Sequence, residues 1–228
     1  MWNRPAPAGF QGLRDDLPVT VYEQLLPHWR QDGATYFVTF RLADSLPQTK
    51  LRELRLFKAE WERKHPPPWS NDKRDELARE VMQRVERWLD QGMGACKLKS
   101  AEAAALVVKA MHANDDSLYE LGFYVVMPNH VHAVVRPLQP REYPLEKILR
   151  DWKGGSSYEI NLLLGSSGTL WQRESFDRII RDEEHLDRVI QYIGRNPNLA
   201  GLTAADVVLW VRPSWVECGW GFESPHDT

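Results

Sequence analysis

Residues 118–136 have the sequence LYELGFYVVMPNHVHAVVR, and this stretch decides the fold. Its β-branched and aromatic residues predict two strands, Leu118–Met127 and His130–Arg136, separated by the turn Pro128-Asn129. A connection this short joins strands that pair antiparallel. The stretch therefore predicts a β-hairpin within an antiparallel sheet.

The rest of the chain alternates between helical and extended patterns. Apolar spacing and capping residues predict helices at Thr49–Lys64, Asp72–Asp90, Ser100–Met111, Pro144–Leu164 and Asp182–Asn196. Further strands are predicted at Thr35–Leu42 and within Leu170–Ile180. We expect Gly154-Gly155 to interrupt the fourth helix, and Pro197 to end the fifth because proline restricts the residue before it. The charges of the first two helices predict a solvated face.

This order of elements predicts an α+β fold, in which helices pack on an antiparallel sheet. We expect one main domain over residues 34–202. Residues 1–33 are rich in Pro and Gly and have little periodicity, so they predict an irregular leader. Residues 203–228 form a Trp-rich C-terminal tail for which no element is predicted.

The composition suits a soluble globular protein. The chain has 228 residues, of which 43% are hydrophobic and 27% charged. It has no CxxC pair, no run of about 18 apolar residues and no signal-peptide pattern at its N-terminus. We therefore expect a cytoplasmic protein outside any membrane, without a zinc knuckle or a disulfide framework. The net charge of −3 argues mildly against nucleic-acid binding, so any basic surface must arise from folding.

The tripeptide His130-Val131-His132 is the strongest chemical signal in the chain. Residues i and i+2 of a strand face the same side, so both imidazoles point one way and Val131 the other. Neutral imidazole binds divalent metals, but a polar strand face without metal has the same pattern. Tyr192 and Asn196 are four residues apart in the predicted helix and share one of its faces. They are either a phenol and an amide that face the histidines or ordinary half-buried helix residues.

Several spaced motifs resemble the REP-associated tyrosine transposases, which are relatives of the single-tyrosine HUH insertion-sequence transposases. Residues 126–132 are similar to the family signature MPNHVH, and Trp152-Lys153-Gly154 resembles its LKG segment. Five later motifs follow the order and spacing of the family, namely LWQRESFDR at 170–178, RDEE at 181–184, Tyr192-Ile193, Asn196-Pro197 and Ala200-Gly201-Leu202. The resemblance spans about Tyr36 to Leu202, and agreement among several motifs is stronger than any single one.

The resemblance implies a ferredoxin-like HUH nuclease fold and a metal-dependent transposase or endonuclease that cleaves and rejoins DNA strands. By this resemblance His130 and His132 bind Mg²⁺ or Mn²⁺, Asn196 completes the metal site, and Tyr192 is the nucleophile that forms a 5′-phosphotyrosine link. The implied partner is single-stranded or hairpin DNA of the REP type. The candidate DNA contacts are Trp152, Lys153, Trp171, Arg173 and Arg178, and for Trp171 a place in the core is an equal alternative.

Other interpretations stay open at this point. A domesticated DNA-hairpin binding protein that keeps the site but no longer transposes would have the same motifs. An unrelated metal hydrolase built on the histidine pair usually recruits carboxylates or further histidines, and the other histidines here lack ligand spacing. The chain could be a monomer, or a homodimer that exchanges the helices bearing Tyr192. The tail tryptophans could cover the active site or pack on the sheet.

Overall fold

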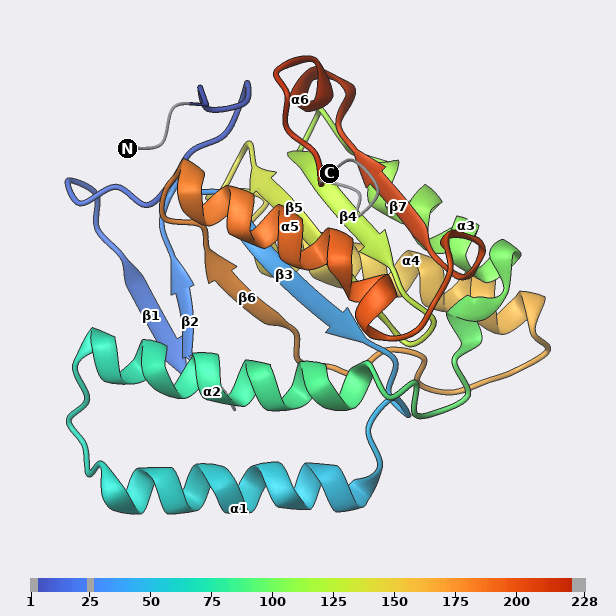
Figure 1. Ribbon diagram of the computed structural model, residues 1–228, viewed down its shortest axis with the longest axis horizontal. Helices are drawn as coiled ribbons and strands as arrows, with labels where there is room; N and C mark the ends of the chain where they lie inside the picture. The colour runs from blue at the N-terminus through green and yellow to red at the C-terminus, as the bar shows by residue number, and fades with distance from the viewer. Residues whose placement is uncertain (1–3, 24–26, 223–228) are drawn as a thin grey trace.

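The computed structural model describes residues 4–23 and 27–222, and its centre is a five-stranded sheet (Figure 1). The strands are β3 (Tyr36–Arg41), β4 (Tyr119–Val126), β5 (His130–Pro137), β6 (Phe176–Ile179) and β7 (Val208–Val211). Their order across the sheet is β6-β3-β5-β4-β7, and every neighbouring pair is antiparallel. The predicted hairpin, β4–β5, therefore lies inside the sheet.

In the described residues the helices are α1 (Gln48–Lys64), α2 (Asn71–Leu89), α3 (Ala101–His112), α4 (Leu145–Leu163), α5 (Glu183–Leu199) and α6 (Pro213–Glu217), with short 3-10 helices η1 (Lys97–Lys99) and η2 (Ala204–Asp206). The chain runs from β3 through helices to the β4–β5 hairpin, then through α4 to β6, and β3 lies between β5 and β6. This is the βαββαβ arrangement of ferredoxin-like folds. The predicted α+β class is confirmed. None of the helices in the described part of the chain has the length and apolar character needed to cross a bilayer.

The two faces of the sheet have different cores, because successive strand residues point to opposite sides. Val38 and Phe40 lie in the core that contains residues of α3 and α4. Phe37 lies in the second core, which includes Ile190 of α5. Figure 1 shows α5 in front of the sheet and α3 and α4 behind it. Val131 belongs to the first core, so its neighbours in β5 face α5.

Two predictions about helix limits are wrong. Helix α4 passes through Gly154 and Gly155 without interruption, since buried residues on both sides of the pair, including Trp152 and Ile160, hold it on the sheet. Helix α5 continues past Asn196 to its end at Leu199, with Pro197 inside it. Pro197 is buried there, and its packing outweighs the missing N–H.

The predicted irregular leader contains a second small sheet, made of β1 (Thr20–Glu23) and β2 (Pro27–Arg30). Asp177 of β6 binds this hairpin by accepting hydrogen bonds from Arg30 and contacting Nδ1 of His28. Burial lowers the pKa of His28, but Asp177 and Glu174 outweigh burial and raise the pKa to about 9. His28 is therefore a cation at neutral pH, and its pairing with a buried carboxylate fixes the hairpin to the main body.

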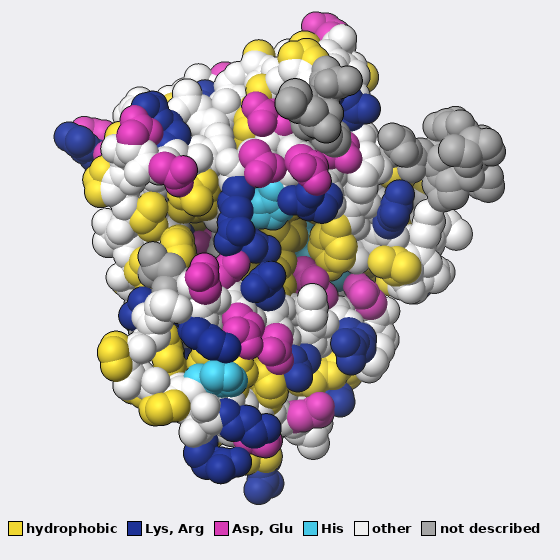
Figure 2. All heavy atoms as spheres, turned by 60° about the vertical axis from the view of Figure 1, so that its left-hand side comes forward, with side chains coloured by type: hydrophobic (Ala, Val, Ile, Leu, Met, Phe, Trp, Pro, Cys, Tyr) yellow, Lys and Arg dark blue, Asp and Glu magenta, His cyan; other side chains and the backbone are white. Residues whose placement is uncertain are grey.

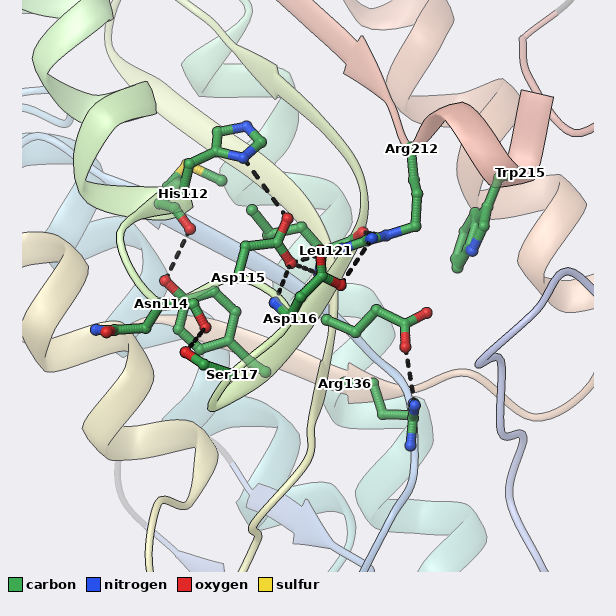
Figure 3. Close-up of polar contacts among 12 residues, drawn as sticks. His112, Asn114, Asp115, Asp116, Ser117, Leu121, Arg136, Arg212 and Trp215 are labelled. Carbon is green, nitrogen blue, oxygen red and sulfur yellow. Dashed lines mark hydrogen bonds and ion pairs between the residues drawn. The ribbon is translucent and has the colours of Figure 1, made fainter. Parts of the chain in front are cut away.

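The Trp-rich tail packs on the sheet. It adds β7 beside β4, and Trp215 and Trp220 enter the core on the α5 side. Arg212 anchors the tail, because its guanidinium donates to Oδ1 of Asp115 at 2.6 Å and to Oδ1 of Asp116 at 2.9 Å (Figure 3). These contacts join the end of the chain to the turn between α3 and β4.

Gly122 of β4 provides a test of how the tail packs. A Cβ atom at this position would lie 2.1 Å from the Trp215 ring, whereas a Cβ at Gly154 would meet nothing within 4 Å. We expect Gly122→Ala to lower the free energy of unfolding by about 1–3 kcal/mol through overpacking. Gly154→Ala should raise it by about 0.5–1 kcal/mol, because alanine is favoured inside a helix. Urea unfolding of both variants measures the two effects. Changes of the same sign in the free energy of unfolding would contradict the packing of Trp215 against β4.

Candidate functional site

His130 and His132 lie next to each other on the face of β5 that is turned toward α5. In the pairing of β3 with β5, His132 stands opposite Thr39 and His130 opposite Arg41. His130 is 1% and His132 0% exposed, and their Nε2 atoms are 3.0 Å apart. The two imidazoles thus aim their outer nitrogen atoms at one point.

The neighbours of each ring assign its protons, and they make Nε2 of His130 the acceptor in its 3.0 Å contact with Nε2 of His132. Nδ1 of His130 lies 2.7 Å from Oδ1 of Asn129, while Nδ2 of Asn129 donates to the carbonyls of Leu89 and Met93. These two bonds fix the orientation of the amide, so its oxygen accepts the Nδ1 proton of His130. The lone pair of His130 is therefore on Nε2. Nδ1 of His132 lies 2.8 Å from the hydroxyl of Thr39, which holds the second ring in place.

Both histidines are neutral. Burial lowers the pKa of His130 to about 3. Burial also lowers the pKa of His132 well below its usual value, and the charge of His130 adds to the effect. Neutral imidazole is the form that binds a metal.

Helix α5 brings Tyr192 and Asn196 over the histidines. The Tyr192 ring centroid is 5.8 Å from that of His132 and 6.3 Å from that of Phe37. Asn196 is 0% exposed, and neither its amide oxygen nor its amide nitrogen has a hydrogen-bond partner. A buried amide without partners is costly, and Asn196 lies one helical turn after Tyr192, on whose hydroxyl it acts.

Two carboxylates of α2, Glu86 and Asp90, complete this buried cluster. Oε1 of Glu86, Oδ1 of Asp90 and the Tyr192 hydroxyl are buried without a hydrogen-bond partner. Burial raises the pKa of Glu86 to about 8 and that of Asp90 to about 6. Burial, followed by the charge of Glu86, also raises the pKa of Tyr192. The hydroxyl of Tyr192 is therefore protonated in this arrangement.

The sequence analysis missed both carboxylates, because it assigned the charges of residues 49–90 to a solvated face. That assignment is wrong for Glu86 and Asp90. They are four residues apart and directly follow Val85 and Leu89, which belong to the buried stripe of α2. This spacing beside an apolar stripe was the available signal.

Arg41 is a further residue that the sequence analysis did not identify. It is 6% exposed and stands opposite His130 in the sheet. Its guanidinium donates to Oγ of Ser45 at 3.1 Å, and burial lowers its pKa to about 10. Arg41 is thus a cation whose charge acts on Lys153 and is stabilised by Glu174. The register of β3 on β5 creates this neighbourhood, and no local pattern predicts it.

A cavity of about 240 Å³ lies between the C-terminal end of α2, the β4–β5 turn and the residues after α5. Asp90 and Asn129 line it, together with Lys99 and Leu202. Since Asn129 holds His130 and Asp90 belongs to the buried cluster, this cavity adjoins the candidate site. Neither histidine lines it.

The donor set fits a divalent metal with oxygen and nitrogen ligands. Within the described residues, His, Cys, Asp and Glu side chains form no group of three or more that could hold a metal. The amide oxygen of Asn196, buried without a partner, is a further group that could act as a ligand. Two neutral imidazoles and one amide would leave the charge of the ion undiminished.

The predicted DNA contacts are not in one place. Trp152 is 1% and Trp171 4% exposed, and their indole nitrogens donate to the Tyr119 hydroxyl and to Oγ of Ser156. Both tryptophans are core residues in this structure, so neither is available to stack on a base. The core alternative for Trp171 is the one the structure supports.

The three predicted cationic contacts lie on two separate surfaces. Lys153 and Arg173 line a cleft of about 570 Å³ beside α4. Lys153 donates to the carbonyls of Gln172 and Arg173, and burial and the charge of Arg41 lower its pKa to about 8. Arg178 instead pairs with Asp75 of α2 at 3.2 Å.

No protein-family profile and no curated protein matches the sequence. A solved structure described as "Structure of the REP associates tyrosine transposase bound to a REP hairpin" is similar, with 16% sequence identity over 75% of this chain and 71% of that chain, and a TM-score of 0.36. This is a distant structural relationship. The class of the chain therefore rests on its own fold and site: a ferredoxin-like α+β protein with a buried histidine pair that faces a tyrosine and an asparagine on one helix.

Proposed function

We propose that this protein is a metal-dependent enzyme that cleaves and rejoins single-stranded or hairpin DNA through a covalent tyrosine intermediate. The observation that carries the proposal is the meeting of two residue pairs that are far apart in the sequence. The Nε2 atoms of His130 and His132 lie 3.0 Å apart, and Tyr192 of α5 packs against His132, with the unpartnered Asn196 one helical turn further along. The sequence resemblance to single-tyrosine transposases assigns roles to the same four residues.

A divalent cation such as Mg²⁺ or Mn²⁺, held by His130, His132 and Asn196, would supply charge neutralisation at a phosphate oxygen. The chain's own residues do the rest. Asn129 and Thr39 orient the two imidazoles. Neutralisation of the phosphate charge would lower the repulsion between the phosphodiester and the attacking oxygen.

Tyr192 is the proposed nucleophile. Its oxygen attacks the phosphorus, the bond between phosphorus and the 3′ oxygen breaks, and the products are a 5′-phosphotyrosine and a free 3′-OH. Because the hydroxyl is protonated in its buried position, its proton must leave during the attack. Glu86 lies against this hydroxyl and can accept the proton in its ionised form, which predominates only above its raised pKa of about 8. Attack by a 3′-OH on the tyrosine ester reverses these steps and rejoins the strand.

The test is a covalent-adduct assay. The purified protein is incubated with end-labelled single-stranded and hairpin oligonucleotides from the DNA that flanks its own gene, with Mn²⁺ or with chelator. We expect a protein–DNA adduct that resists denaturant, requires the metal, and is absent in Tyr192→Phe. The variant keeps the aromatic ring, so its fold should be unchanged.

Tyr158, which is 74% exposed on α4, provides the matched control. Tyr158→Phe should form as much adduct as the unchanged protein. An adduct that survives Tyr192→Phe would mean that another residue is the nucleophile. Binding of hairpin DNA without any adduct would favour a DNA-hairpin binding protein that has lost cleavage.

A further inference from the structure

Three arginines share one carboxylate at the end of the α2–α5 interface that is remote from Glu86 and Tyr192. Oδ2 of Asp75 lies 2.8 Å from Nη2 of Arg181, 3.2 Å from Nη2 of Arg178 and 3.7 Å from Nε of Arg79. The side chains of Arg79 and Arg181 are 54% and 52% exposed, whereas Asp75 is 16% exposed. We call these three cations and Asp75 the arginine cluster.

The arginine cluster has an excess of positive charge. Three guanidinium groups face one carboxylate, and the nearby Arg188 is paired with Glu184 at 2.6 Å. The pKa of the buried His185 reflects this positive charge. Burial is the largest cause that lowers the pKa, to about 4, and the charges of Arg178, Arg188 and Arg181 lower it further. Acidic groups are close as well, since Asp182 caps α5. Figure 2, which views the N-terminal ends of α2 and α5, shows Lys and Arg side chains gathered near the middle of this face with acids around them.

Asp75 and Arg79 of the arginine cluster lie on the same face of α2 as Glu86, while Arg178 belongs to β6 and Arg181 directly precedes α5. Asp75, Arg79, Met82, Glu86 and Asp90 follow each other at intervals of three or four residues, so they form one stripe of α2. The opposing stripe of α5 contains His185, Val189, Tyr192 and Asn196. Figure 1 shows that both helices run in the same direction.

The distance between the arginine cluster and the candidate site follows from the geometry of α2. Glu86 follows Asp75 by eleven residues, which corresponds to about 16 Å along a helix. A few nucleotides of extended strand can span this distance. A cavity of about 70 Å³, lined by Asp75, Arg79, Met82, Arg178 and Arg181 among others, opens beside the arginine cluster.

We propose that the arginine cluster binds the phosphodiester backbone of the DNA strand whose cleaved bond lies at Tyr192, with Asp75 as an internal competitor for the same guanidinium groups. The inference rests on the proposed function for the identity of the strand. Phosphate oxygens and the Asp75 carboxylate make the same charge-assisted bonds to arginine. A bound backbone would therefore replace Asp75 as the partner of Arg79 and Arg181, which are the more exposed cations.

The test measures binding of a fluorescein-labelled single-stranded oligonucleotide by fluorescence anisotropy, in chelator so that no cleavage occurs. We expect Arg79→Ala and Arg181→Ala each to weaken binding roughly three- to tenfold at low salt, and to reduce the slope of log K against log salt by about 0.7. Asp75→Asn should strengthen binding roughly threefold or more, because it frees the guanidinium groups. The opposite signs separate a phosphate site from a purely structural ion pair, for which all three variants would weaken binding.

Arg55→Ala is the matched control, since Arg55 is an exposed arginine of α1 outside the arginine cluster. The affinity of Arg55→Ala for the labelled oligonucleotide should equal that of the unchanged protein. Thermal unfolding of each variant confirms that the fold is kept. Equal binding by all arginine variants, or no binding of the unchanged protein to single-stranded or hairpin DNA at low salt, would overturn the inference. Binding that depends on Arg79 and Arg181 without adduct formation would instead support it and contradict the cleavage proposal alone.

Discussion

Replacement of His132 by alanine is expected to abolish the stabilisation of the fold by Mn²⁺ and to lower adduct formation by at least about 100-fold. The unchanged protein should gain about 2.7 kcal/mol of stability when free Mn²⁺ is 100 times its dissociation constant. His132 contributes one of the two convergent Nε2 atoms, and its loss leaves half of the imidazole pair. The measurement is the thermal midpoint with Mn²⁺ minus that with chelator, followed by the adduct assay.

The difference between the two midpoints is the decisive quantity, because His132→Ala also leaves a cavity in the core and lowers both values. Thr39→Val is a milder variant that removes only the hydroxyl at 2.8 Å from Nδ1 of His132. It should weaken Mn²⁺ binding about 10- to 100-fold. His112, which contacts Tyr124 at 3.1 Å, supplies a control: His112→Ala should keep the full response to Mn²⁺. Metal stabilisation that persists in His132→Ala would place the metal elsewhere.

Glu86→Gln is expected to stabilise the metal-free protein at alkaline pH by roughly 2–4 kcal/mol. Burial raises the pKa of Glu86 to about 8, from 4.5 for an ordinary glutamate. Below pH 4.5 the carboxyl is protonated in both the folded and the unfolded chain, so it costs nothing. As the pH rises from 4.5 to 8 the unfolded chain releases this proton before the folded chain does, and stability falls by up to about 1.36 kcal/mol per pH unit. Above pH 8 the cost is constant.

The measurement is a set of urea unfolding curves in chelator between pH 4.5 and 9, for the unchanged protein and for Glu86→Gln. Glutamine has the shape of glutamate but carries no charge, so the decline of stability with pH should become shallower. Asp90, whose pKa is raised only to about 6, should still cause a smaller loss of stability at lower pH in Glu86→Gln. Glu80→Gln is the control on the same helix, since the Glu80 carboxylate is 38% exposed and paired with Arg84. An unchanged pH profile in Glu86→Gln would show that Glu86 is solvated in the folded protein.

The amino-acid sequence alone was enough to predict the parts of the protein that depend on local periodicity. Alternation in residues 118–136 predicted the β4–β5 hairpin, and with it the common direction of His130 and His132. The spacing of four residues placed Tyr192 and Asn196 on one helix face. These inferences hold because side-chain direction within one strand or helix is fixed by backbone geometry alone.

Only the tertiary structure decided which elements meet. It brought Glu86 and Asp90 of α2 to Tyr192, and it set Arg41 opposite His130 through the register of β3 on β5. It also put Trp152 into the core, although its motif had suggested a DNA contact. Folding minimises the free energy of the whole chain at once, so long-range packing, rather than the residues beside it in the sequence, sets the neighbours of a side chain.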